Sequence, residues 1–338
     1  MTEAGPATTY EWAGLLIRSP FRLPGAAPAH VDHHDLDVAL GPSRLAPSEL
    51  PPGDVVVERR HRGRLWFAAS RTGDGYVCRL PGMADFLLNA SLDEVVCVPD
   101  PGQKTDMVPL LLSGVVTAFV LSILGRCVLH ASGVVGHGEV LAFAGPTGTG
   151  KSTLAALFCA SGALLVADDL LPVQALRCER RAVCTPTAGE VRLRPRAASL
   201  AELFPAGVAR SVAADGRLTV APVRAPGPAL PLGAIVLPVL RRDQTEVAVR
   251  GLAPGEAMWH LARCLRIVGW TDKTVLSRQF DQLAALVTSV PVMEVDLPWR
   301  APPHPGLVLQ MLAALGLPRP GPSHRSSTCG IAESRDVS

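Results

Sequence analysis

The stretch from residue 139 to 153 restricts the fold of this chain more than any other. A short apolar run, residues 140–144, meets a glycine-rich loop, and Lys151, Ser152 and an apolar helical pattern follow. Residues 145–152 have the pattern Gly-x-x-x-x-Gly-Lys-Ser, in the strand–loop–helix setting that this pattern requires. The alternative is a glycine-rich turn that matches by chance, which the flanking elements disfavour.

The residue types in this loop suit a triphosphate. Glycines at three positions allow backbone conformations in which successive N–H groups point inward, and the positive end of the following helix adds to that field. Lys151 would place a positive charge on the outer phosphates, and the Ser152 hydroxyl would ligate Mg²⁺. The sequence therefore predicts a site for ATP and Mg²⁺. The predicted cofactor-binding residues are Gly145, Pro146, Thr147, Gly148, Thr149, Gly150, Lys151, Ser152 and Thr153.

Charge and cysteine usage disfavour several other classes of protein. The 32 Lys and Arg residues nearly balance the 30 Asp and Glu residues, so no nucleic-acid footprint follows from charge. The eight cysteines form no C-x-x-C pair and no Cys/His spacing typical of zinc, which favours reduced thiols in a cytoplasmic protein. The N-terminal residues have neither the basic region nor the apolar core of a secretory signal.

An uncharged segment, residues 108–125, is about long enough to span a bilayer. Pro109, Ser113 and Gly114 interrupt it, it has no aromatic belt, and strand-like residues 127–129 follow at once. We therefore expect a helix buried under the nucleotide-binding sheet and no membrane partner, with a transmembrane span as the alternative.

The residues before this helix divide into two parts. Residues 1–50 are rich in Pro, Ala and His, which predicts partial order with an edge strand near 10–17. The histidines and aspartates of residues 30–35 form either a polar loop or a metal site. Residues 51–100 contain short β-prone runs separated by turns and predict a small antiparallel β domain. Its basic turn, residues 59–64, is either a solvated hairpin tip or a docking surface for an acidic or phosphorylated partner.

Two carboxylates follow the glycine-rich loop at the end of the next buried strand. Residues 163–167 are apolar and β-prone, and Asp168 and Asp169 come directly after them. An apolar strand that delivers a carboxylate at its C-terminal edge, beside the phosphates, is typical of a Walker-B arrangement.

The pattern further on predicts the rest of one catalytic domain over residues 105–305. A β-rich segment spans residues 171–251, and helices are expected over 256–268 and 273–288, before a closing strand and a last short helix. The tail, residues 318–338, is rich in Pro, Gly, Ser and Arg and is expected to be disordered.

With these features in place, residues 129–169 resemble the catalytic domain of HPr kinase/phosphorylase, especially the shorter HPr-kinase-like proteins of bacterial peptide modification. His130 precedes the loop, and Asp168-Asp169 follows it, at the spacings of that family. The resemblance implies a mixed α/β P-loop kinase domain related to phosphoenolpyruvate carboxykinases, here preceded by the small antiparallel β domain. HPr kinases are hexamers, so the resemblance is also compatible with a homo-oligomer.

The resemblance also implies roles for individual residues besides Lys151. Asp168 would be the general base that takes the proton of a serine hydroxyl, and Asp169 would support it or reach the metal. His130 would hold the phosphate and Asp168 in register, with an ordinary core histidine as the alternative. Glu190 is the nearest candidate for the family's further metal ligand, with a surface glutamate as the alternative. The predicted metal ligands are therefore Ser152, Asp169 and Glu190.

The chain departs from the HPr kinase pattern at two points. Thr153 stands where HPr kinases carry glutamate, and their second signature strand is missing, so no phosphorolysis is predicted. The leading hypothesis is an ATP-dependent kinase that phosphorylates a serine hydroxyl of a peptide or protein. The alternatives are a small-molecule kinase or carboxykinase-like enzyme, a non-catalytic ATP-binding switch, and an ATPase without an acceptor.

Overall fold

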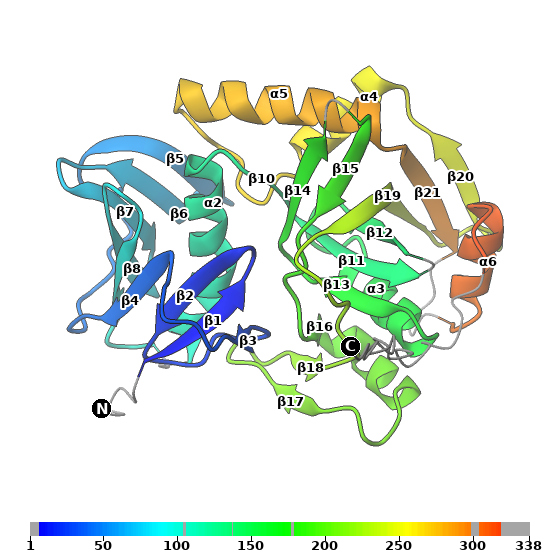
Figure 1. Ribbon diagram of the computed structural model, residues 1–338, viewed down its shortest axis with the longest axis horizontal. Helices are drawn as coiled ribbons and strands as arrows, with labels where there is room; N and C mark the ends of the chain where they lie inside the picture. The colour runs from blue at the N-terminus through cyan, green and yellow to red at the C-terminus, as the bar shows by residue number, and fades with distance from the viewer. Residues whose placement is uncertain (1–6, 104–105, 137, 177–178, 299–303, 319–338) are drawn as a thin grey trace, which may run out of the picture.

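The computed structural model describes residues 7–103, 106–136, 138–176, 179–298 and 304–318. The fold is mixed α/β with mixed sheets, as the sequence predicts. Figure 1 shows two large sheets side by side, a helical segment next to the N-terminal one, and helix α5 along the top of the molecule. The predicted disordered tail, apart from its first residue, lies outside the described residues.

The N-terminal half forms a nine-stranded sheet in the order β3-β1-β2-β4-β9-β8-β7-β6-β5. Strands β5 to β9 form the antiparallel meander expected over residues 51–100. The sheet extends past residue 50, because residues 8–40 supply four more strands, and it is mixed, because β4 runs parallel to both β2 and β9. Its strands are β1 (Thr8–Trp12), β2 (Leu15–Ser19), β3 (Ala27–Pro28), β4 (Leu36–Leu40), β5 (Asp54–His61), β6 (Arg64–Arg71), β7 (Gly75–Leu80), β8 (Ala84–Asn89) and β9 (Glu94–Pro99).

The uncharged segment after this sheet is a continuous helical stretch. It begins as α1 (Met107–Leu111), passes through a π-helical turn, η1 (Leu112–Val116), and ends as α2 (Thr117–Ile123). It is buried as expected, but its apolar side chains share a core with the N-terminal sheet instead of lying under the nucleotide-binding sheet. Among the described residues, none of the helices has the length and apolar character needed to cross a bilayer.

The second half is built on a second mixed sheet with the path β10-β14-β15-β19-β12-β11-β13, to which β21 and β20 add beside β19. The β12–β19 and β19–β21 pairs are parallel, and the other pairs are antiparallel. Its strands are β10 (Cys127–Leu129), β11 (Ala131–Gly136), β12 (Glu139–Ala144), β13 (Leu164–Ala167), β14 (Leu171–Leu176), β15 (Arg181–Cys184), β19 (Leu230–Arg241), β20 (Ala248–Gly251) and β21 (Val292–Pro298).

A small three-stranded sheet and five helical segments complete this half. The small sheet has the order β16-β18-β17 and lies below the main sheet in Figure 1. Its strands are β16 (Val191–Leu193), β17 (Arg210–Val212) and β18 (Leu218–Val220). The helical segments are α3 (Lys151–Ala160), the 3₁₀ segment η2 (Pro195–Leu203), α4 (Pro254–Ala262), α5 (Lys273–Ser289) and α6 (Leu307–Ala314).

Helix α4 is shorter than the helix predicted over residues 256–268. The chain leaves the helix after Ala262 and bridges β10 instead, where the backbone N–H of Arg266 donates to Val128 and the N–H of His130 donates to Cys264. These bonds to a neighbouring strand replace the helical ones, so a tertiary contact overrides a favourable local pattern. The consequence is that Arg266 stands next to the end of β10.

The same connection joins the two sheets. Trp270 forms a β-bridge with Val57 on the edge strand β5, and its indole stacks on Phe119 with ring centroids 5.5 Å apart. Within the N-terminal half, the indole N–H of Trp12 donates to the Ser113 carbonyl in η1 at 2.8 Å and so ties β1 to the helical stretch. Buried aromatic contacts of this kind stabilise the packing of the N-terminal sheet on the second half.

Candidate functional site

Sheet topology explains why distant stretches of the sequence meet at one edge. Strand β11 lies between β12 and β13 and runs antiparallel to both, with Ala131 opposite Ala144 and Gly133 opposite Ala167. The start of β11 therefore lies at the same edge as the ends of β12 and β13. His130 precedes β11, the glycine-rich loop follows β12, and the Asp168-Asp169 pair follows β13.

The glycine-rich loop connects β12 to α3 as the pattern predicts. Gly145, Gly148 and Gly150 have φ angles of 154°, 96° and 89°, a region that residues with side chains rarely adopt. A Cβ on Gly145 would lie 2.9 Å from the Thr149 hydroxyl, which itself donates to the Pro146 carbonyl. The middle of the loop is exposed: these residues are Pro146, Thr147 and Gly148.

Lys151 begins α3 and turns back onto the loop. Its Nζ donates to the carbonyls of Gly145 at 2.8 Å and Pro146 at 2.9 Å. Burial lowers the pKa of Lys151 to about 8, with the carboxylates of Asp169 and Asp168 acting in the opposite direction. A buried ammonium held only by carbonyl oxygens would gain from an anion at this place.

Asp168 is bound to the loop. Its Oδ1 accepts from the hydroxyl of Ser152 at 2.6 Å and from the hydroxyl of Ser132 at 2.8 Å. Its Oδ2 accepts from the backbone N–H of Arg192 at 2.9 Å. All three donors are neutral, and they come from three elements: Ser152 from α3, Ser132 from β11 and Arg192 from β16. Asp168 is thus fixed beside the first turn of α3.

Asp169 faces a different set of groups and has a strained backbone, with φ at 83°. Its Oδ2 accepts from Arg266 at 2.9 Å and from Arg192 at 3.3 Å, and its Oδ1 lies 3.0 Å from Nε2 of His130. Burial opposes the charge, but Arg266, His130 and Arg192 together hold the pKa of Asp169 well below its usual range. Asp169 is therefore the charged centre of a basic pocket.

His130 contacts Asp169, and this differs from the sequence-based expectation that it would hold Asp168 in register. Burial lowers the pKa of His130, while the neighbouring Asp169 carboxylate acts in the opposite direction. The imidazole donates its Nε2–H to the Asp169 carboxylate, 3.0 Å from Oδ1.

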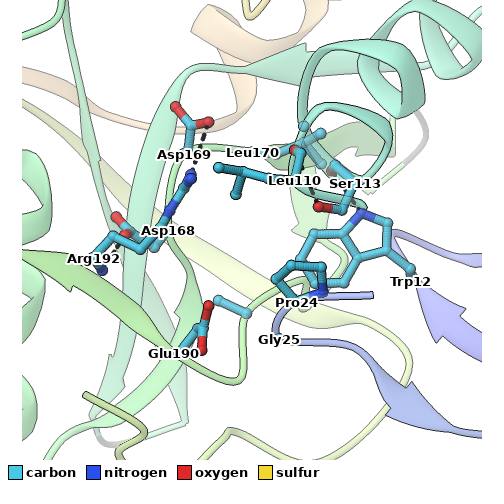
Figure 2. Close-up of a pocket in the computed structure, with 12 residues that line it drawn as sticks. Trp12, Pro24, Gly25, Leu110, Ser113, Asp168, Asp169, Leu170, Glu190 and Arg192 are labelled. Carbon is cyan, nitrogen blue, oxygen red and sulfur yellow. Dashed lines mark hydrogen bonds and ion pairs between the residues drawn. The ribbon is translucent and has the colours of Figure 1, made fainter. Parts of the chain in front are cut away.

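Glu190 lies on the turn before β16, away from the loop, in a cavity that Figure 2 shows between the carboxylates and the N-terminal segment. Burial raises the pKa of Glu190, with Arg192 and Arg22 acting against this shift. The structure draws together no group of three His, Cys, Asp or Glu side chains able to hold a metal ion, within the part of the chain that it describes. Of the predicted metal ligands, Asp169 and Glu190 line this cavity, whereas the Ser152 hydroxyl donates to Asp168.

The donors that do converge are the oxygens of Ser152 and Asp168, 2.6 Å apart. Mg²⁺ prefers oxygen ligands and keeps several waters, taking one or two protein groups together with substrate phosphates. These two side chains fit that requirement, so a magnesium ion here would depend on Ser152 and Asp168 and not on a complete protein cage.

The cavity beside the carboxylates has a volume of about 30 Å³, the space of roughly one water molecule. The N-terminal segment supplies part of its wall through Trp12, Pro24 and Gly25. A Cβ on Gly189 would lie 2.8 Å from the Gly25 carbonyl oxygen, so the two backbones touch. The β1–β3 region therefore closes one side of the site.

Three residues of this site were not identified from the sequence: Ser132, Arg192 and Arg266. Arg192 lies in the run that pointed to Glu190, where a charged residue among apolar ones was the available signal. Arg266 falls in the segment predicted as helix, and its place depends on the bridge to β10, which no local pattern reveals. Ser132 follows His130 by two residues on a strand, so period-two alternation places both side chains on one face.

Comparisons with known proteins add little to this description. No protein-family model and no curated protein matches the chain. One solved structure with some likeness is the Hpr(Ser) kinase/phosphatase from Coxiella burnetii, at 12% identity and a TM-score of 0.30, over 56% of this chain and 93% of that one. At this score the likeness supports neither fold nor function, and the site has to be interpreted from its own residues.

Proposed function

We propose that this chain is an ATP-dependent phosphotransferase that moves the γ-phosphoryl group to a serine hydroxyl of a peptide or protein. One contact carries the proposal: the 2.6 Å hydrogen bond between Ser152, in the first turn after the glycine-rich loop, and Asp168, at the end of a neighbouring strand. In P-loop enzymes a serine or threonine and a carboxylate in this relation share the magnesium of the nucleotide. A chance glycine-rich turn gives no reason for such a pair.

The two carboxylates divide the chemistry, and the contacts favour the reverse of the sequence-based assignment. Asp168 is bound to Ser152, so we assign it to the metal side, where a bound Mg²⁺ would neutralise charge on the phosphates. Asp169 lies on the other side, next to His130 and Arg266, so we assign it to the acceptor.

In this scheme Asp169 accepts the hydrogen bond of the attacking hydroxyl. A carboxylate offers about four acceptor positions, and Asp169 uses three of them. The hydroxyl oxygen attacks the γ-phosphorus, the bond to the β-phosphate oxygen breaks, ADP leaves, and the proton passes to Asp169. Phosphoryl transfer depends more on orientation than on basicity, so the low pKa of Asp169 is compatible with this role.

Lys151 is the phosphate-binding cation in this scheme. Its Nζ donates to the carbonyls of Gly145 and Pro146. These are neutral acceptors, and an anionic phosphate oxygen is a stronger partner for an ammonium. The exposed N–H groups of the loop would bind the same phosphates.

The serine acceptor and the homo-oligomer come with the resemblance to HPr kinases, the cytoplasmic location comes from the cysteine usage, and all three belong to the same proposal. The division into a β domain, which includes residues 8–40 together with the strands of 51–100, and a catalytic domain predicted over 105–305 belongs to the proposal as well. Small-molecule phosphorylation, a carboxykinase-like reaction, acceptor-free ATP hydrolysis and a non-catalytic switch are separate outcomes of one experiment.

The test is incubation of the purified chain with γ-labelled ATP, Mg²⁺ and either a serine peptide library or a metabolite extract. The proposal is supported if serine is labelled by the parent and not by Lys151→Ala, Asp168→Asn or Asp169→Asn. The control is Asp296→Asn, which should retain labelling because Asp296 pairs with Arg241 away from the site. Label only in metabolites, or only as free phosphate, contradicts peptide phosphorylation. Mg·ATP binding with no transfer of any kind indicates a switch.

A further inference from the structure

The β5–β6 hairpin carries the strongest run of positive charge near the site. Residues 58–64 contain four arginines and one glutamate, which gives a net charge of +3 with His61 neutral. Arg62 and Arg64 are exposed and Arg60 pairs with Glu58 at 2.6 Å. The guanidinium of Arg59 lies over the exposed ring of Trp66, 5.2 Å from its centroid. A cation stacked on an aromatic ring in this way is held in place.

The position of β5 directs this hairpin toward the site. Strand β5 is the edge of its sheet, and residues 269–271 run antiparallel along it: Glu58 N–H donates to Gly269, and Thr271 N–H donates to Val56. Because the two segments are antiparallel, the residues that follow Glu58 on β5 lie beside the residues that precede Gly269, in the direction of Arg266. The side chain of Arg59 touches Gly269, since a Cβ there would lie 3.5 Å from its Cγ.

Arg266 connects the hairpin to the carboxylates. Burial and the charge of nearby Arg266 lower the pKa of Arg59, so the two guanidiniums are neighbours. One nitrogen of Arg266 bonds Asp169 at 2.9 Å and lies beside Gly114, which lines the cavity of Figure 2. Its Nε is buried and has no hydrogen-bond partner among the residues that the structure describes. A buried donor of this kind has room for one more hydrogen bond, which a water or a ligand group can supply.

We propose that residues 58–64 of the hairpin and Arg266 together form a binding surface, the docking track, for an acidic polypeptide. A serine of this polypeptide would lie next to Asp169 and be phosphorylated there. This proposal rests on the proposed kinase function for the fate of the serine, but the binding of the acidic segment stands by itself. An anionic bilayer is the competing partner for arginines beside a tryptophan. The position of Arg266 favours a peptide, because an extended chain can reach from the hairpin past Arg266 to the buried Asp169 carboxylate, whereas a flat bilayer cannot.

Strand geometry gives the spacing of the acidic residues. From Arg59 to Arg62 the strand covers about 10 Å, at about 3.3 Å per residue. An extended peptide alongside covers that distance in about three residues. Acidic residues about three positions apart in such a peptide would therefore match the spacing of Arg59 and Arg62. Exposed pairs contribute little individually, so the effect comes from several charges acting together and is sensitive to salt.

The turn at the hairpin tip allows a variant that keeps the fold. Arg62 and Gly63 have φ angles of 50° and 78°, as in the two-residue turn in which Asn-Gly and Asp-Gly are preferred. Arg62→Asn with Arg64→Gln removes two charges, and Arg62→Asp with Arg64→Glu reverses them, without opposing that turn. Arg196→Glu with Arg242→Glu, at two exposed arginines outside the hairpin, is the matched control.

The assay measures binding of a fluorescent serine peptide flanked by glutamates, at low and high salt and without nucleotide, beside a glutamine version of the same peptide. We expect the reversed pair to weaken binding of the glutamate peptide by at least about tenfold, the neutral pair by less, and the control by less than about twofold. Phosphoryl transfer to that peptide should show the same order in KM, with Mg·ATP binding unchanged.

Equal affinity for the glutamate and glutamine peptides, or an unaffected reversed pair, overturns the docking track. Tighter binding to vesicles with phosphatidylserine than to the peptide, lost in the reversed pair, overturns it in favour of a membrane surface. Binding of the glutamate peptide without phosphorylation supports the docking track and contradicts the kinase proposal. Phosphorylation of both peptides at equal rates supports the kinase proposal and contradicts the docking track.

Discussion

Replacement of Asp169 by asparagine separates the acceptor side of the site from the nucleotide side. The change keeps the shape of the side chain and removes its charge from between Arg266, Arg192 and His130. Breaking a fully buried ion pair costs about 3–5 kcal/mol, and breaking an exposed one costs less than about 1 kcal/mol. The side chains of Asp169, Arg192 and Arg266 are 25%, 16% and 12% exposed. We therefore expect the free energy of unfolding to fall by about 1–3 kcal/mol.

This loss of stability has a defined pH dependence. The pKa of Asp169 in the folded chain is well below its ordinary value of about 3.9, so the carboxylate stabilises the fold above that value. The contribution is lost as the pH falls through the folded pKa. The difference between the parent and Asp169→Asn, measured by urea unfolding, should be largest near pH 7 and should shrink below about pH 4.

The same variant should lose transfer and keep nucleotide binding. A positioned carboxylate contributes about 10²–10⁴-fold to rate, so transfer to serine should fall by that range. Mg·ATP affinity should stay within a few-fold or rise, because two arginines lose their anionic partner. The assays are initial rates with γ-labelled ATP and calorimetric titration with Mg·ATP. Transfer at near-parental rates, or a loss of ATP binding as large as that of Lys151→Ala, would refute the division between the two carboxylates.

Three further outcomes follow from single contacts. Lys151→Met should be more stable than the parent near pH 7, because the parent buries a charged ammonium there. The parent lysine has a pKa of about 8 in the folded chain and about 10.5 in the unfolded chain, so the difference in unfolding free energy should shrink between these two pH values. Urea unfolding at several pH values, without nucleotide, checks this. Ser132→Ala removes a buried hydroxyl 2.8 Å from a carboxylate oxygen and should cost about 1–3 kcal/mol of unfolding free energy, and unchanged stability would contradict that contact. Gly189→Ala would place a Cβ 2.8 Å from a backbone carbonyl oxygen of the N-terminal segment and should lower the melting temperature, while Gly207→Ala, which meets nothing within 4 Å, should not.

Local patterns predicted much of the second half of the molecule. The loop, its strand and its helix are encoded in adjacent residues, and so is the strand that delivers Asp168 and Asp169. The expected helix over residues 273–288 corresponds to α5 (Lys273–Ser289), where Asp272 caps the first turn by accepting from two backbone N–H groups. Signals carried by a few consecutive residues were therefore reliable.

Features that depend on distant contacts were not predictable in this way. Residues 8–40 join the nine-stranded sheet through pairings such as β4 with β9, in which Asp37 lies opposite Glu94, far along the chain. The helical stretch over Met107–Ile123 is apolar on all sides, so its pattern does not reveal which of the two sheets it packs on, and the expected sheet was the wrong one. Arg266 reaches Asp169 only because Leu265 bridges Leu129.

The division between Asp168 and Asp169 was also beyond the sequence. Two adjacent identical residues carry no local signal that distinguishes them. The left-handed backbone at Asp169 turns its side chain toward Arg266 and His130, whereas Asp168 faces Ser152 and Ser132. The resemblance to HPr kinases assigned the roles of the two aspartates, and the contacts of their side chains are the basis for proposing the reverse assignment.

Calorimetric titration of the purified chain with ATP, in the presence of Mg²⁺ and then of EDTA, tests the central claim most directly. The account predicts saturable binding that weakens when Mg²⁺ is removed, is lost in Lys151→Ala, and becomes insensitive to Mg²⁺ in Asp168→Asn, because Ser152 and Asp168 are the oxygen donors beside the loop. Absence of ATP binding by the parent, or binding that Lys151→Ala leaves unchanged, would contradict it.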